Sequence, residues 1–150
     1  MSQPRAAPIR TTRVMPRVTD DRVSADALSK AIARAWARQT SADPAGWSAA
    51  NPAWGQCAVT ALIVQDFFGG ELFRCEVNSI SHYWNRLASG KELDLTGHQF
   101  GNGFRASRGE SRTRAYVMSF PDTAARYRRL SASTRRALQR LVPLAQTNRA

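Results

Sequence analysis

The sequence has few of the residues that build disulfide networks and metal sites. Its 150 residues include two cysteines, Cys57 and Cys75, and two histidines, His82 and His98. Two cysteines can form one disulfide at most, and a chain of this length can build its core without one, so we expect two thiols. The sequence contains neither a Cys-x-x-Cys pair nor closely spaced histidines. A zinc site made of these four side chains is therefore not predicted, and no cofactor is expected.

Long apolar runs are also absent. No run approaches the roughly 20 apolar residues of a membrane-spanning helix, and the arginine-rich first 18 residues lack the apolar centre of a signal peptide. We therefore predict a cytoplasmic protein with no membrane partner. The chain does contain 43% hydrophobic residues and four tryptophans. This composition excludes a wholly disordered protein and favours one compact domain.

Lysine is scarce, since only two of the 22 basic residues are lysines, and the formal net charge is +11. The positive charge lies in the flanks of the chain. Residues 1–18 carry four arginines and no acid, and residues 105–140 carry ten arginines against two acids, whereas residues 41–99 carry six acids against three basic residues. A basic surface can bind a polyanion or nucleic acid, or it can be the solvated face of helices. Because no nucleic-acid-binding motif is recognisable, nucleic acid is not the partner that we expect.

The pattern of apolar residues predicts an α+β fold. Residues 1–18 hold three prolines and no periodicity, which indicates a disordered basic arm; residues 19–143 are predicted to form a single domain and residues 144–150 a tail. Helices are expected at 24–38, 57–68, 121–130 and 133–142, and strands at 71–77, 81–87, 91–95 and 114–120, with an irregular segment at 97–111. This order favours a small antiparallel sheet packed against a central cysteine-bearing helix and flanking helices.

Cys57 is the first candidate for a functional residue. It follows Trp54-Gly55-Gln56 and opens a nearly apolar run that ends at Phe68, before two glycines. A thiol in the first turn of a helix lies beside unsatisfied N–H groups and the positive end of the helix dipole, which favour the thiolate. Taken alone, a cysteine on an apolar helix also fits simple core packing.

The predicted hairpin between residues 81 and 95 supplies a candidate base and its partner. A three-residue loop with Gly90 in the left-handed conformation pairs Leu87 with Lys91, sets Trp84 opposite Asp94, and leaves His82 diagonal to Asp94 on the same face. A two-residue loop would instead shift the register by one residue and move Asp94 away from His82. We favour the first register, because it also pairs Arg86 with Glu92. We expect the helix that begins at Cys57 to cover the face that carries His82 and Asp94.

These residues together predict nucleophilic catalysis. Cys57 would be the nucleophile, His82 the base that takes its proton, and Asp94 the residue that orients the imidazole. The Cys57 N–H and the side chain or N–H of Gln56 could form an oxyanion hole. Positioning roles fall to two tryptophans, Trp54 in the loop before Cys57 and Trp84 opposite Asp94.

Five motifs in this part of the chain form a recognisable set: NPAWGQCAVTA at 51–61, SHYWN at 81–85, DLT at 94–96, QF at 99–100 and SFPDTAARY at 119–127. As a set they resemble the YunG-type family of small bacterial proteins, over roughly residues 47–127. By fold analogy, the order of Cys57, His82 and Asp94 also resembles the core of papain-like and transglutaminase-like thiol enzymes. That resemblance implies a Cys57 nucleophile, a His82 base and an Asp94 orienter.

The sequence therefore predicts a cysteine-dependent hydrolase or acyltransferase with chemistry similar to that of thiol proteases. Its substrate would be a peptide or other amide, an isopeptide, a glutamine side chain or a thioester, and it would react through an acyl-enzyme at Cys57. The alternative is a non-catalytic interaction module whose basic flanks bind a polyanion or nucleic acid.

Overall fold

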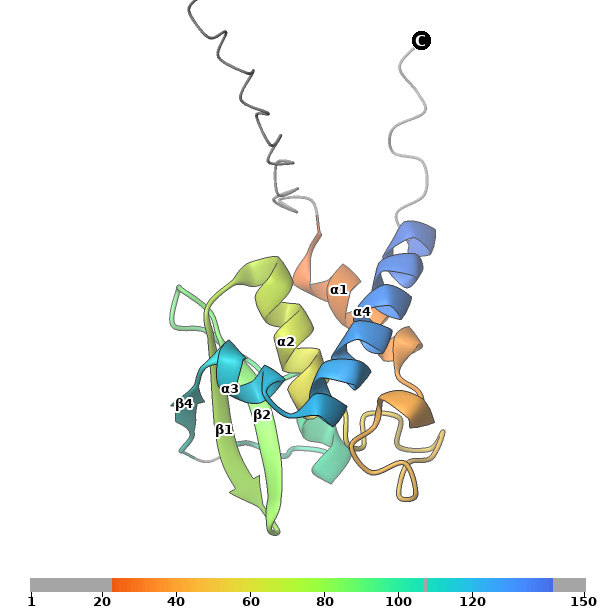
Figure 1. Cartoon of the computed structure of the whole chain (residues 1–150). Coiled ribbons are helices and arrows are strands. Elements are labelled where there is room, and N and C mark those ends of the chain that lie inside the picture. Colours follow the sequence, from red (N-terminus) through yellow and green to blue (C-terminus); the bar gives the residue numbers. More distant parts are fainter. Residues whose placement is uncertain (1–22, 107, 142–150) are drawn as a thin grey trace, which may run out of the picture.

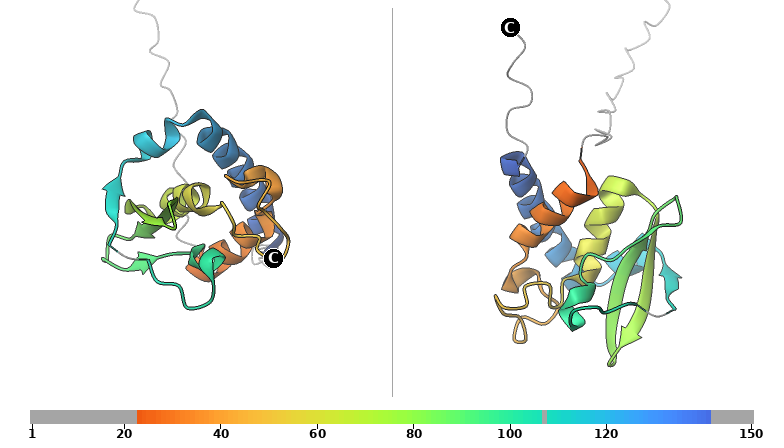
Figure 2. Two further views of the ribbon diagram at one scale, coloured as in Figure 1. Left: turned by 90° about the horizontal axis from the view of Figure 1, so that it is seen from below. Right: turned by 180° about the vertical axis from the view of Figure 1, so that it is seen from behind.

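One helix, α2 (Cys57–Phe68), lies at the centre of the fold, between a four-stranded antiparallel sheet on one side and the helices α1 (Ala25–Ala35) and α4 (Pro121–Leu141) on the other (Figures 1 and 2). This computed structural model describes residues 23–106 and 108–141. The predicted arm at 1–18 and tail at 144–150 lie outside these residues. The α+β class with a small antiparallel sheet, predicted from the sequence, is confirmed.

Helix α2 has the bounds that the sequence predicts, because its residues are apolar on almost every side. Val59, Leu62 and Val64 are completely buried. Its core position explains this pattern, since one side of the helix packs on the sheet and the other on α1 and α4. The helix ends at Gly69, which has a positive φ of 68° and whose N–H donates to the Gln65 carbonyl at 2.8 Å.

The sheet has the strand order β3-β2-β1-β4. β1 (Glu71–Val77) and β2 (Ile80–Arg86) form a hairpin whose two turn residues, Asn78 and Ser79, both have positive φ, as a type I′ turn requires. The outer strands are short, β3 covering Glu92–Leu93 and β4 covering Glu110–Arg112.

The register between β2 and β3 is the predicted one. Arg86 pairs with Glu92, the Leu87 N–H donates to the Lys91 carbonyl at 2.8 Å, and Gly90 has a positive φ of 85°. β3 is shorter than the expected strand at 91–95, because the Asp94 side chain accepts the Thr96 N–H at 3.2 Å and turns the chain out of the sheet.

Two other expectations are wrong. The segment 114–120 was expected as a strand but forms the helix α3 (Arg114–Met118), because the Thr113 side chain caps the Tyr116 N–H at 3.1 Å and Val117 packs beside α2. The two helices expected at 121–130 and 133–142 are one continuous helix, α4. Ser131 and Ala132 do not break a helix, and the buried Leu130, Thr134, Ala137 and Leu138 continue one helical face through them.

The remaining elements are the helix α1 and two 3₁₀ turns. Ser24 caps α1 by accepting the Ala27 N–H at 3.0 Å, as its place before the predicted helix suggests. The turn η1 (Arg38–Thr40) lies between α1 and α2, and the turn η2 (Gly97–Phe100) lies between β3 and β4. Within the described residues, no helix is long and apolar enough to cross a membrane.

Candidate active site

The sheet carries His82 on the face that points away from α2. On the opposite face, Leu72 and Tyr83 pack against α2, and the Asn85 side chain donates to the Ala61 carbonyl of α2 at 2.9 Å. His82 alternates with these residues along β2 and therefore lies on the other face. The expectation that α2 covers the His82 face is wrong, because α2 packs on the Leu72 side and the aromatic rings of Phe100 and Phe104 cover His82 on the other side.

Cys57 nevertheless lies beside His82, at the part of the β2 edge that β3 leaves unpaired. β3 pairs only with Asn85 and Arg86, so the earlier part of β2 has no partner strand on that side. There the Cys57 Sγ donates to the Ser81 carbonyl at 3.4 Å. The thiol also interacts with the His82 ring closely enough to influence its pKa. The two side chains therefore meet at the edge of the strand and not across the sheet.

His82 and Asp94 form the best-defined contact of the site. The His82 Nε2 and the Asp94 Oδ2 are 2.7 Å apart, and the His82 side chain is completely buried. This contact leaves Nδ1 as the ring nitrogen that can face the thiol, and Nδ1 has no hydrogen-bond partner of good geometry among the described residues. Burial by itself lowers the pKa of His82, but hydrogen bonds to Asp94 and Cys57 and the electrostatic interactions with both raise it to about 9.

Aromatic rings enclose the imidazole on its remaining sides. Trp84 stacks on it with 5.8 Å between ring centroids, and Phe100 and Phe104 meet it edge-on at 5.1 and 5.5 Å. Gly97 leaves room for this packing, since a Cβ there would lie 2.8 Å from the Asp94 Oδ2 and 3.2 Å from the Phe104 ring. The enclosure fixes the ring orientation and keeps water from the imidazole.

The loop before Cys57 is held by two buried amides. The Gln56 side chain is fully buried and donates to the Ala37 carbonyl at 2.9 Å, while the Gln56 N–H donates to the Ala53 carbonyl at 3.0 Å. Gln99 accepts the Gly55 N–H at 3.1 Å through its side chain. The backbone N–H of Gln56 is thus already bonded, and one N–H of its side-chain amide anchors the loop. Its role as an oxyanion donor stays a prediction.

The first turn of α2 offers another donor. The N–H of Cys57 has no hydrogen-bond acceptor among the described residues, as expected at a helix start. This N–H lies next to the thiol by covalent geometry, so it can stabilise negative charge on an oxygen of a group that the thiol attacks.

Trp54 does not touch the imidazole. Its indole N–H donates to the Asp43 carboxylate at 3.0 Å, and its ring meets Phe100 edge-on at 6.2 Å. It therefore supports the site through Phe100, whereas Trp84 supports it directly. The ring contacts of Phe104 had no signal in the sequence, because they depend on the path of an irregular segment.

The other cysteine lies opposite His82 on β1, whereas the other histidine lies outside this arrangement. Cys75 is buried with Phe73 and Trp84 on the face of the sheet away from α2. It pairs with His82 across the two strands through the backbone register. His98 is exposed and packs near Trp36, with ring centroids 5.9 Å apart. The described residues contain no group of three or more side chains arranged to hold a metal ion.

The comparisons with known proteins agree on one family. A family model described as YunG protein matches residues 24–139, a range that includes the three central residues of the site. An uncharacterized protein named YunG from Bacillus subtilis (strain 168) is 38% identical over 69 residues. That alignment covers 46% of this chain and 56% of the relative, so the chain spans little more than half the length of this curated relative. No solved structure matches the chain significantly.

Proposed function

The chain belongs to the YunG protein family, and for this member we propose a cysteine-dependent hydrolase or acyltransferase that acts through an acyl-enzyme at Cys57. The acyl donor would be a peptide or other amide, an isopeptide, a glutamine side chain or a thioester. The observation that carries the proposal is the arrangement around His82. Its Nε2 is 2.7 Å from Asp94, and its other nitrogen is left for the Cys57 thiol.

The raised pKa of His82 supports a thiolate–imidazolium pair. With a pKa of about 9, the imidazole is protonated at neutral pH, and its positive charge stabilises a thiolate on Cys57. Asp94 would keep the ring in place and balance its charge. No metal or cofactor takes part in this mechanism.

The proposed reaction has two halves. In the first, the Cys57 sulfur forms a bond to the carbonyl carbon, and the oxyanion that develops is stabilised by the Cys57 N–H. The C–N bond of an amide then breaks, the His82 proton passes to the leaving amine, and the acyl group stays on sulfur. In the second half, neutral His82 takes a proton from water or an acceptor amine, which attacks the acyl carbon and releases the thiolate.

The packing of the central helix supports a papain-like or transglutaminase-like core as part of the same proposal. In both this fold and those enzymes, a helix that begins with the cysteine packs on an antiparallel sheet that carries the histidine. The analogy concerns architecture and the order of the three residues, and it leaves the substrate to be determined.

The reactivity of the two cysteines tests the proposal. Cys57 and Cys75 are 8% and 7% exposed, so burial alone predicts equally slow alkylation of both. We expect iodoacetamide near neutral pH to label Cys57 faster by on the order of tenfold or more. Site-resolved mass spectrometry measures both rates in the same sample.

Three variants complete this test. His82→Ala should remove the difference between the cysteines and abolish turnover in a screen with activity-based acyl probes, for which Cys57→Ala is the blank. Asp94→Asn should keep the fold and lower the turnover rate by about two to four orders of magnitude, because the ring loses its orienting anion. Faster labelling of Cys75, or equal labelling of both in the wild type, would remove Cys57 as the nucleophile.

A specific observation also keeps the second candidate function, polyanion binding, open to test. An open groove with a volume of about 260 Å³ lies between α1 and α4 and is lined by Arg34, Arg136 and Arg140. Among the described residues, none of these three arginines forms an ion pair with an acid. A groove with three such cations can attract phosphate or carboxylate groups.

A further inference from the structure

Helix α2 covers only part of the sheet face on which it packs. The part of this face that lies past the N-terminal end of α2 is uncovered, and its side chains are polar. Strand pairing places Arg74 opposite Tyr83 on β2 and opposite Glu110 on β4, so these three side chains share this face. Ser81 lies on the same face, one position beyond Tyr83 in the alternation of β2. This surface adjoins the thiol, because Cys57 heads α2 and donates to the Ser81 carbonyl.

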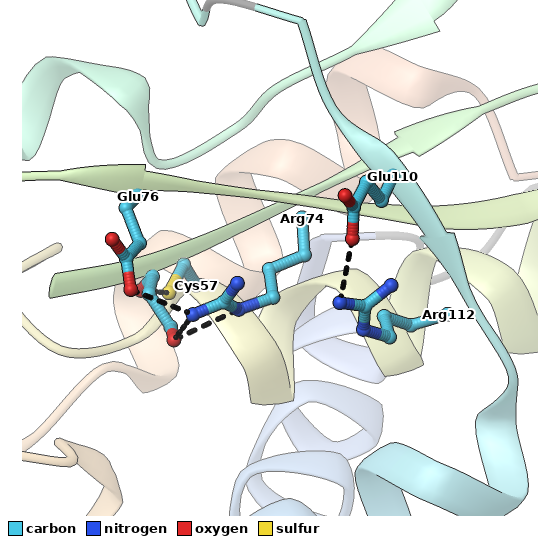
Figure 3. A network of polar contacts seen from close by, with 6 residues as sticks. Cys57, Arg74, Glu76, Glu110 and Arg112 are labelled. Atoms are coloured by element: carbon cyan, nitrogen blue, oxygen red, sulfur yellow. Dashed lines mark hydrogen bonds and ion pairs between the residues drawn. The ribbon is translucent and has the colours of Figure 1, made fainter.

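Arg74 is held firmly in this surface. Its Nε and Nη2 both donate to the Ser81 Oγ, at 3.0 and 2.8 Å. Ser81 therefore links the guanidinium to the thiol. Its hydroxyl accepts from Arg74, and its carbonyl accepts from Cys57. Figure 3 shows Arg74 with its acidic neighbour Glu76 and the sulfur of Cys57 close by. Because two bonds fix it, the guanidinium loses little freedom when it binds a further group.

The guanidinium of Arg74 has only a weak ion pair on this face. Its only carboxylate contact in the described residues is with Glu76, at 3.4 Å, and the Glu76 side chain is 66% exposed. The neighbouring pair of Arg112 and Glu110 is closer, at 2.8 Å. An exposed, single contact of that length contributes little, so a carboxylate brought in by a ligand can replace it.

Tyr83 connects this charge to the thiol. Burial is the largest cause of the raised pKa of Tyr83; the electrostatic interaction with Tyr116 raises this pKa further, Arg74 lowers it, and Cys57 raises it. All three groups therefore lie within electrostatic range of one phenol. Tyr116 is 47% exposed at the border of the same surface and provides apolar contact area beside the charge.

We propose that Arg74, with Tyr83 and Tyr116 beside it, forms the acyl-group subsite, and that it selects acyl donors carrying a carboxylate a few bonds from the reacting carbonyl. This inference rests on the proposed function and names its substrate class, an acidic peptide or a similar acidic acyl compound. The guanidinium binds the substrate carboxylate in place of Glu76, and the reacting carbonyl is then held at the Cys57 sulfur.

A pair of small alkylating agents tests the subsite in the full chain. Iodoacetate carries a carboxylate next to its reacting carbon, and iodoacetamide is its neutral counterpart. The measured quantity is the ratio of their rates at Cys57, determined by site-resolved mass spectrometry near neutral pH. The positive charge of His82 raises this ratio in every variant that keeps His82, so the change between variants isolates the contribution of Arg74.

We expect Arg74→Gln to lower the ratio by about fivefold, the size of one exposed charge pair, and Glu76→Gln to raise it, because the competing carboxylate is removed. The matched control is Arg86→Gln, since Arg86, at the last position of the neighbouring strand β2, forms a similar exposed pair with Glu92 at 3.0 Å. This control should leave the ratio unchanged. Circular dichroism checks that each variant folds, and Glu76→Gln carries the test if Arg74→Gln does not.

Two outcomes separate the inference from the proposed function. Fast labelling of Cys57 with a ratio that stays the same in Arg74→Gln and Glu76→Gln overturns the subsite and leaves the thiol mechanism in place. Labelling of Cys57 that is as slow as that of Cys75 with both reagents overturns the thiol mechanism, and the subsite inference falls with it.

Discussion

The chemistry of this site depends on how a single buried imidazole is partnered. His82 is completely buried, which by itself would favour the neutral ring, yet its Nε2 lies 2.7 Å from the Asp94 carboxylate and the Cys57 thiol is close by. The interactions with Asp94 and Cys57 outweigh the burial. Among the described residues, Nδ1 has no hydrogen-bond partner of good geometry. A buried ring nitrogen without a hydrogen-bond partner lowers the stability of the fold, and such groups are found mostly where a protein binds or reacts.

The raised pKa of His82 predicts a specific dependence of stability on pH. Folding raises this pKa from its ordinary 6.5 to about 9, so the folded protein holds the proton more tightly than the unfolded chain. The resulting stabilisation, on the order of 3 kcal/mol, is complete below pH 6.5 and is lost as the pH rises through about 9. Urea denaturation at a series of pH values between 6 and 10 measures it.

The control for this pH prediction is His82→Gln, which should flatten the curve in that interval. Asp94→Asn should reduce the slope, since it removes the carboxylate that raises the pKa of the imidazole. A wild-type free energy of unfolding that stays constant, or increases, from pH 6.5 to 9 would contradict the protonated form of His82.

At the scale of elements, the site is assembled by the turn that follows β3. Asp94 leaves the sheet with one carboxylate oxygen on the Thr96 N–H at 3.2 Å and the other on His82. Gly97 lies against this carboxylate, and the chain then places Phe100 and Phe104 over the imidazole. The hairpin register brings Asp94 to His82, and the turn fixes the direction of its side chain.

A methyl group at position 97 should therefore disturb the site more than the fold. The Cβ of Gly97→Ala would lie 2.8 Å from the Asp94 Oδ2, so the carboxylate must move away from His82. We expect the alkylation rate of Cys57 to fall by about 10- to 100-fold, with a loss of about 1–3 kcal/mol in stability. NMR titration should also show a lower pKa for His82, with His98 as an internal reference.

Gly69→Ala provides a matched comparison for the glycine substitution. Gly69 has a positive φ of 68° and open space around its Cβ position, at the end of α2 far from Cys57. That variant should lose stability through backbone strain while its labelling rate stays close to that of the wild type. If both variants lose reactivity equally, the effect arises from general destabilisation and not from Asp94.

For the molecule as a whole, most of the positive charge and the candidate active site lie in different places. The net charge of +11 comes from the flanks, and the described part of it includes the long helix α4, whose arginines lie mostly on its exposed side. The candidate active site lies at the first turn of α2 and on the sheet, within residues 41–99, where acids outnumber basic residues. The groove of Arg34, Arg136 and Arg140 is therefore a separate feature from the thiol site.

We expect the basic surface to bind nucleic acid only weakly and without specificity. Any attraction should decrease steeply with salt, because neutralising phosphates releases counterions. Fluorescence anisotropy with single- and double-stranded oligonucleotides should show no submicromolar affinity at near-physiological salt. Submicromolar binding that is lost when Arg34, Arg136 and Arg140 are changed to glutamine would contradict this and would favour the interaction-module alternative.

The sequence by itself determined the features that depend on neighbouring residues. The apolar run after Cys57 and the two glycines that follow Phe68 fixed the bounds of α2, and the placement of Gly90 fixed the register that brings His82 to Asp94. These are local patterns of periodicity and turn chemistry, which a single sequence expresses directly. They also carried the family resemblance, since the motifs around Cys57, His82 and Asp94 lie within the matched range.

Only the tertiary structure decided which face of the sheet α2 covers and what surrounds the imidazole. The helix packs on the Leu72 side of the sheet, and the thiol then reaches His82 at an edge that β3 leaves open. The strand expected at 114–120 became a helix, because a cap at Thr113 and burial of Val117 outweighed its β-forming residues. The packing of Phe104 on the imidazole and the position of the Arg74 guanidinium both depend on contacts between distant segments. No local pattern in a sequence records such contacts.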